Sequence, residues 1–145
     1  MTTPQRLETV RRLQTAMATA YTTMGAWCLL HPPSVLALGF TPTYLAMCNT
    51  TTSLFVRCFG AQAMTCGLVL GTSTMTPFSF TAFGVAMVPY LMWNYWFGIG
   101  PGRGMVTSLM WMDFVGNVFF GAGSLYCAKL LREQEEEEED KRKAK

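Results

Sequence analysis

Charged residues are almost absent from most of this sequence. Between Leu13 and Ala128, the formally charged side chains are Arg57, Arg103 and Asp113. A soluble domain carries about a quarter charged residues, spread along its length. The missing charge therefore excludes an ordinary soluble domain and predicts a multi-pass protein whose partner is the lipid bilayer.

Motifs for several kinds of chemistry are also missing. The five cysteines and the one histidine show no Cys-x-x-Cys or Cys/His spacing, so no metal site and no cofactor is predicted. The basic residues are not interleaved with aromatic residues, so nucleic acid is not expected as a partner. No activated nucleophile or phosphate-binding loop is present, which leaves open whether the protein is an enzyme.

Four apolar segments remain, each near the roughly 20 residues that a membrane span needs. The first ends at "HPP", where two prolines deny the helix its amide donors. Pro89 should kink the third, and the many glycines should let neighbouring helices approach closely. The sequence thus predicts an all-α, integral membrane four-helix bundle with spans at about 13–30, 50–72, 77–98 and 104–128.

Arginines and lysines predict the orientation of these spans. They gather before the first span and after the fourth, whereas the first loop has none. By the positive-inside rule both termini are cytosolic. We therefore expect a cytosolic N-terminal segment at 1–12, a membrane domain at 13–128, and a disordered, charged cytosolic tail at 129–145.

Two short signals favour the endoplasmic reticulum. Asn49 begins the sequon "NTT", a candidate glycosylation site on the lumenal side. Lys141 and Lys143 resemble a cytosolic dilysine retrieval signal, with a generic basic tail as the alternative.

Arg57 and Asp113 are the two charges expected inside the membrane. The helical rise places them at about 10 Å and about 14 Å below the lumenal ends of their spans. Burying either alone costs at least ~2.5–3.5 kcal/mol, which pairing would reduce. We therefore predict that these two side chains meet.

Other polar and aromatic side chains belong to the same lumenal half. Asn117 follows Asp113 by four residues, so both should project from one helix face. The candidate catalytic residues are Asp113, Arg57 and His31. The candidate ligand-binding residues are Arg57, Asn94, Asn117 and Trp93.

Three features together resemble small DoxX-like four-helix membrane proteins. They are "LLHPPSVLALGF" at the end of the first span, "RCFG" in the second and "DFVG" in the fourth. The resemblance covers about residues 13–128 and implies the four-helix architecture. That family includes membrane partners of oxidoreductases, but no quinone or metal motif accompanies the resemblance here.

Two functions follow as hypotheses. In the first, the Arg57/Asp113 site binds, or assists chemistry on, a lipophilic small molecule. In the second, the protein has a structural or assembly role with another membrane protein, and Arg57/Asp113 is an ion pair that fixes helix register. A transporter is less well supported, because no inverted repeat is visible.

Overall fold

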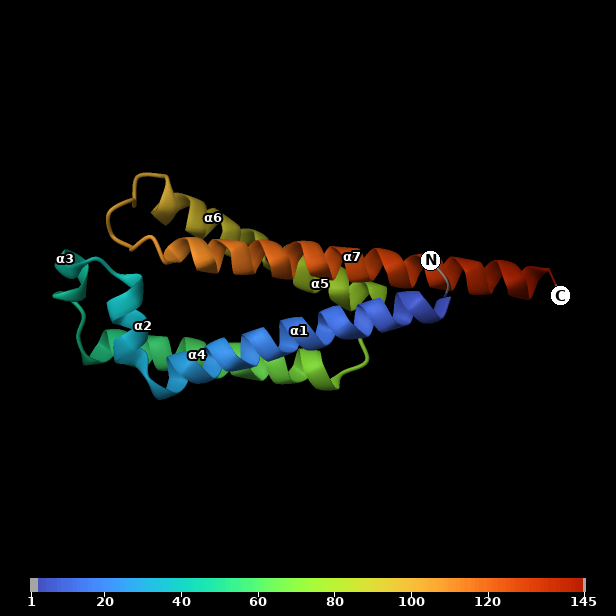
Figure 1. Ribbon diagram of the computed structural model, residues 1–145, viewed down its shortest axis with the longest axis horizontal. Helices are drawn as coiled ribbons and strands as arrows, with labels where there is room; N and C mark the ends of the chain where they lie inside the picture. The colour runs from blue at the N-terminus through green and yellow to red at the C-terminus, as the bar shows by residue number, and fades with distance from the viewer. Residues whose placement is uncertain (1–2, 145) are drawn as a thin grey trace.

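The computed structural model describes residues 3–144, and within this part of the chain every regular element is a helix (Figure 1). This confirms the prediction of an all-α protein. The long helices are α1 (Thr3–Leu30), α4 (Thr50–Thr72) and α7 (Met110–Lys143). The shorter ones are α2 (Pro32–Gly39), α3 (Pro42–Leu45), α5 (Pro77–Ala86) and α6 (Val88–Gly98).

The helices form two layers that run along one long axis (Figure 1). α1 and α4 make one antiparallel pair, and α7 packs along α5 and α6 in the other. α1 joins the layers, because it also packs against α7, whereas α4 makes no substantial contact with α7 in the described residues. The spatial order is therefore α4, α1, α7 and then α5 with α6.

Apolar and sulfur-containing side chains fill the contact between the layers. Tyr21 of α1 packs on Phe120 of α7 with ring centroids 4.5 Å apart. One turn along, the Ser124 hydroxyl of α7 donates to Met17 Sδ at 3.6 Å, and both residues are fully buried. These contacts fix an antiparallel register in which α7 residues before Phe120 lie beside the C-terminal turns of α1.

Glycines bring the backbones of α1 and α4 together. A Cβ atom on Gly60 would lie 2.5 Å from the Leu29 nitrogen and 2.6 Å from the Gly25 oxygen. On Gly67, it would lie 2.6 Å from the Thr22 nitrogen. In apolar surroundings the hydrophobic effect does not drive helices together. Close packing at small residues such as these stabilises the helix pair instead.

The third apolar segment is broken, as Pro89 predicts. α5 ends at Ala86 and α6 begins at Val88, with Met87 between them donating its N–H to the Gly84 oxygen at 3.2 Å. Proline lacks the N–H that would continue the ladder. The fourth segment differs from expectation. Its helix begins at Met110, and residues 104–109 are irregular, with turns and an isolated bridge at Val106.

Two described helices, α4 and α7, are long and apolar enough to cross a membrane. Only 22% of the apolar window in α4 and 39% of that in α7 is buried inside the protein. α5 and α6 are 10 and 11 residues long, so neither reaches span length by itself. α1 is longer, but its threonines make it less apolar.

Residues 129–143 of the predicted disordered tail are helical instead: α7 continues to Lys143 and projects beyond the bundle (Figure 1). Its first tail turns pack on α1, where Arg6 Nη1 donates to Glu137 Oε1 at 2.6 Å. Arg6 Nε also lies 3.9 Å from Glu133 Oε2. An i,i+4 ion pair also forms in this part of α7, with Lys129 Nζ 3.8 Å from Glu133 Oε1.

The contact between Arg6 and Glu137 should loosen in acid. The Arg6 hydrogen bond lowers the pKa of the Glu137 carboxyl from its ordinary value of 4.5. A lowered pKa means that the contact stabilises the folded protein above about pH 4.5 and that this stabilisation is lost as pH falls through the lower, folded value. We expect the protection of the α7 amides beyond Glu133, measured as their exchange rate relative to that of the unfolded chain at the same pH, to fall below that pH. Glu137→Gln should show lower protection at neutral pH and a weaker pH dependence, and identical protection profiles would contradict the prediction.

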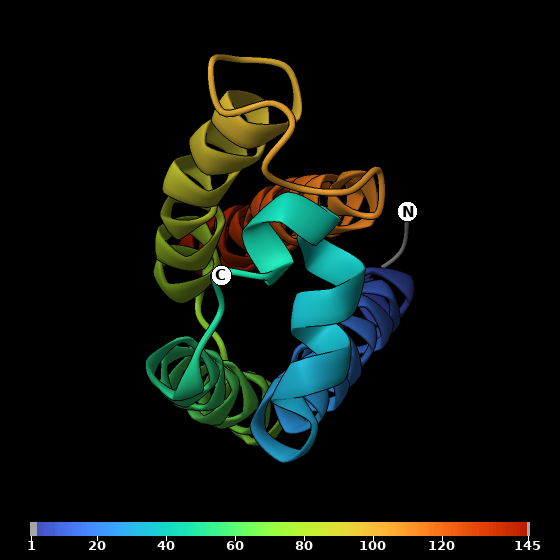
Figure 2. The same cartoon turned by 90° about the vertical axis from the view of Figure 1, so that its left-hand side faces the viewer.

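At the other end of the molecule, two loops are joined. α2 lies across this end, and the residues that follow it contact the loop between α6 and α7 (Figure 2). An antiparallel bridge links Phe40 to Val106, with Thr41 N donating to Met105 O at 3.1 Å and Thr107 N donating to Gly39 O at 2.9 Å. The first loop therefore covers the end of the bundle where α7 begins.

Candidate functional site

Three polar side chains meet at the start of α7. Asn94 Nδ2 of α6 donates to Asp113 Oδ2 at 2.7 Å, and Asn117 Nδ2 donates to the same oxygen at 3.1 Å. Asn117 Nδ2 also lies 2.8 Å from Asn94 Oδ1. Both amides are only 6% exposed, whereas Asp113 is exposed. We call these three residues the Asp113 network.

The sequence explains why the network forms at this place. Asp113, Asn117, Phe120 and Ser124 recur at helical spacing, so they share the face of α7 that packs on other helices. Asp113 also lies in the first turn of α7, where the unpaired backbone N–H groups favour a negative charge. The carboxylate is thus stabilised by two amide donors and a helix N-terminus, and no cation of residues 3–144 pairs with it.

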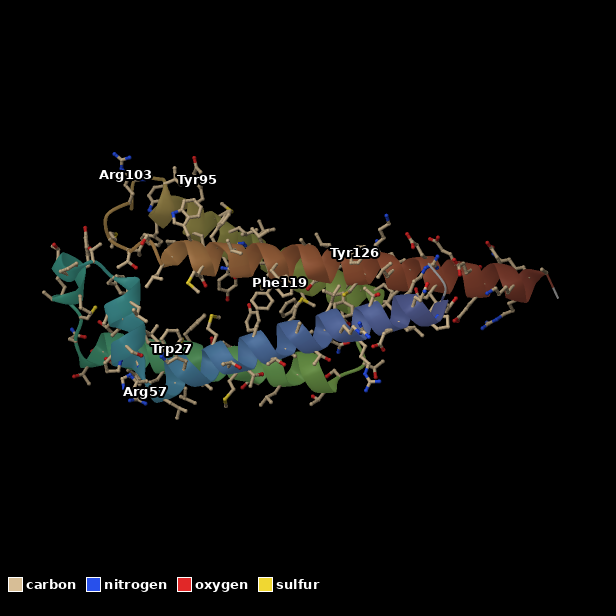
Figure 3. All side chains as sticks on the ribbon, in the orientation of Figure 1. Trp27, Arg57, Tyr95, Arg103, Phe119 and Tyr126 are labelled. Atoms are coloured by element: carbon tan, nitrogen blue, oxygen red, sulfur yellow. The ribbon has the colours of Figure 1, made fainter. Side chains whose placement is uncertain are left out.

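The predicted pair between Arg57 and Asp113 is wrong. Among the described residues, no ion pair or hydrogen bond joins these two side chains, because α1 separates α4 from α7. Arg57 lies at the outer edge of the α1–α4 pair (Figure 3). The expected similarity in depth was reasonable, since Arg57 reaches the last turn of α1, but matching depth did not make the two helices neighbours.

Arg57 instead caps the C-terminus of α1. Its Nη1 donates to the Leu29 oxygen at 2.7 Å. In a continuous helix the N–H four residues later would serve this carbonyl, but that position is Pro33, which has none. A cation at a helix C-terminus also interacts favourably with the helix dipole. Arg57 therefore supplies the donor that the "HPP" sequence removes.

A side chain of α1 caps the C-terminus of α4 in the same way. Gln14 Nε2 of α1 donates to the Leu70 oxygen at 2.6 Å and to the Ser73 oxygen at 2.9 Å, at the C-terminal end of α4. α1 and α4 therefore cap each other's last turn. We refer to Arg57 and Gln14 as the reciprocal caps.

The remaining predicted site residues lie outside the Asp113 network. Trp93 is exposed on α6 and stacks on Phe97, with centroids 5.3 Å apart. His31 is exposed at the N-cap position of α2. Asn49 caps α4, with its Oδ1 accepting from Thr52 N at 3.1 Å. The structure thus brings together Asp113, Asn94 and Asn117, but neither Arg57 nor His31.

Sequence reasoning missed two contributors to these sites. Gln14 was not singled out, although it is an amide at the start of the predicted span 13–30, where it can donate to the end of an antiparallel neighbour. Met110 was not singled out either, yet its Sδ accepts from Asn94 Nδ2 at 3.3 Å. For Arg57, the signal was present in the two prolines of the first loop, which leave carbonyls of α1 without donors.

The network presents an acceptor surface. Oδ2 of Asp113 accepts from two amide N–H groups, and the exposed carboxylate has no cationic partner among the described residues. A group that donates hydrogen bonds, such as an amine or a hydroxyl, complements it. An anionic or carbonyl oxygen, which an arginine would have held, does not.

In the described residues the chain is thus all-helical, with two helices apolar enough to cross a membrane and, at one end, a network of two buried amides with an exposed carboxylate. No protein-family model, curated protein or solved structure matches it significantly. The resemblance to DoxX-like proteins therefore stays a prediction.

Proposed function

We propose that this chain is a multi-pass membrane protein of the endoplasmic reticulum whose Asp113 network binds the polar head of a lipophilic small molecule. Four segments would cross the bilayer: α1, α4, α5 with α6 taken together, and the apolar part of α7. Both termini would be cytosolic, and the Asp113 network would lie in the lumenal half.

The distribution of exposed side chains supports the membrane placement. A core helix of a soluble protein would be mostly buried, but most of α4 and α7 is not. Large apolar side chains are exposed along α4, α5 and α6, among them Leu54, Phe55, Phe78 and Met92. An apolar surface this extensive would be unstable in water and is stable against lipid.

One observation carries the binding role: a charged carboxylate in an apolar region is held by two buried amides rather than by a cation. Ionisable residues inside a membrane are costly and are functional candidates for that reason. Asn94 and Asn117 would orient the Asp113 carboxylate, which would accept from an amine or hydroxyl of the ligand. One ionisable group suits binding better than acid–base catalysis, which needs a matched donor and acceptor.

The alternative is a purely structural or assembly role with another membrane protein. The reciprocal caps and the glycine contacts between α1 and α4 favour it, because they show that Arg57 stabilises the fold. In that case the Asp113 network would fix the packing of α6 on α7, and no ligand would accompany the protein.

Asp113→Asn separates the two functions. Asparagine keeps an acceptor oxygen for Asn94 and Asn117 but removes the charge that a donor ligand needs. We expect mass spectrometry of the purified full chain to detect a lipophilic amine or hydroxyl compound with the native protein and at least about tenfold less with the variant, since charge-assisted hydrogen bonds are the stronger ones.

Arg103→Gln is the control, because it removes a charge from the exposed loop before α7 (Figure 3) and should leave ligand content unchanged. Circular dichroism and thermal unfolding would establish that all three proteins are folded. Equal ligand content in the native protein and Asp113→Asn, both folded, would reject the binding role and favour the structural alternative.

A further inference from the structure

A groove of about 280 Å³ lies between α5 and α7, near the end of the bundle that carries the two termini. Arg132 of α7 reaches across it, with Nη2 donating to Thr81 Oγ1 of α5 at 2.9 Å. The remaining lining comes from α7, which contributes Leu125, Ala128, Lys129, Glu133 and Glu136. This groove is separate from the Asp113 network, which lies near the opposite end of the bundle.

The side chains along the groove change character in a fixed order. Leu125 and Ala128 are apolar, Lys129 and Arg132 follow as cations, and Glu136 is an acid one turn beyond Arg132. One turn of helix advances about 5.4 Å. Toward the end of α7, the groove thus presents an apolar wall, then positive charge, then negative charge.

This order matches the boundary of a bilayer on the cytosolic side. α7 is apolar before Lys129 and highly charged after it. Lysine and arginine gather at the cytosolic ends of spans, where the headgroups of lipids lie. With the membrane placement proposed above, Leu125 faces the hydrocarbon, Lys129 and Arg132 lie at headgroup depth, and Glu136 lies just outside.

We propose that the groove binds one zwitterionic glycerophospholipid. An acyl chain would pack along Leu125 and Ala128, and the phosphate would accept from Lys129 and Arg132. The ammonium, which lies beyond the phosphate in such a lipid, would meet the Glu136 carboxylate. Guanidinium groups are well suited to phosphate oxygens.

The acids are the reason for choosing a zwitterionic lipid over an anionic one. Glu133 is already shared between Lys129, at 3.8 Å, and Arg6, at 3.9 Å. Glu136 is exposed beside the groove. Both kinds of lipid place the same phosphate on Lys129 and Arg132. A zwitterionic headgroup adds an ammonium group that neutralises the Glu136 carboxylate, whereas the headgroup of phosphatidylglycerol ends in neutral hydroxyl groups.

The test uses the full chain in detergent with two probes of identical acyl chains, phosphatidylethanolamine and phosphatidylglycerol. Native mass spectrometry would measure how much of each lipid is retained. We expect the native protein to retain several-fold more phosphatidylethanolamine. Arg132→Gln should reduce retention of both lipids, and Glu136→Gln should remove or reverse the preference. Glu135→Gln is the matched control, because Glu135 is exposed on the same helix but does not line the groove.

Equal retention of the two lipids by the native protein, or an unchanged preference in Glu136→Gln, would overturn the proposal. The inference rests on the proposed membrane placement, so extraction of cell membranes at alkaline pH is measured in parallel. Release of the chain from membranes would reject that placement. Retention in membranes without a lipid preference would reject the phospholipid site alone.

Discussion

Gly60→Ala should destabilise the protein severely, whereas Gly116→Ala should not. A Cβ at position 60 meets the backbone of α1, namely the Leu29 nitrogen and the Gly25 oxygen, so the two helices must separate. Alanine favours a helix interior by about 1 kcal/mol, but overpacking against a rigid backbone costs ~1–3 kcal/mol and occasionally more. Because both contacts are to backbone atoms, we expect the upper end of the overpacking cost, which leaves a net loss of roughly 2 kcal/mol after the gain from alanine.

Gly116 supplies the matched control on α7. A Cβ there would lie 3.9 Å from Phe120 Cε2, an ordinary contact, so the helix-propensity gain should remain. Thermal unfolding of both variants in one detergent measures the difference. Similar melting temperatures would mean that α1 and α4 do not pack through Gly60.

The second large effect concerns Arg57 and Asp113, whose substitutions should add without coupling. Arg57→Ala removes the donor to the Leu29 oxygen, and a hydrogen bond involving a charged group contributes ~1.5–3 kcal/mol. Asp113→Ala leaves the amide donors of Asn94 and Asn117 without their carboxylate acceptor, at a cost of ~1–3 kcal/mol. Because the two residues share no partner, the double mutant should equal the sum within about 0.5 kcal/mol.

A second cycle, Asp113→Ala with Asn94→Ala, provides the contrast. These side chains are joined at 2.7 Å, so their effects should be coupled by ~0.5–3 kcal/mol. Free energies of unfolding from one denaturant series would give both couplings. A strong coupling between Arg57 and Asp113 would contradict the structure and support the predicted ion pair.

The sequence predicted the helical content because that content depends on local patterns. Apolar length defined α4, the paired prolines ended α1, and Pro89 located the break between α5 and α6. It did not predict which helices touch. Helix depth follows from counting residues along one span, whereas neighbour relations depend on packing between distant segments.

The candidate site shows the same division. Asp113 and Asn117 belong to one helix, so their shared face was predictable from their spacing. The contribution of Asn94 to the network was not, because it depends on how α6 packs on α7. Arg57 was misassigned because only an anionic partner, Asp113, was considered, although a guanidinium group can also donate to a backbone carbonyl that has no donor.

The reciprocal caps have a consequence for biogenesis. Arg57 and Gln14 donate hydrogen bonds to carbonyls at the C-terminal ends of α1 and α4, so these caps need no other part of the chain. Because these helices are also synthesised first, the N-terminal half can assemble as a hairpin while the ribosome is still translating α7. The remaining helices would then dock onto this preformed helical pair as they emerge.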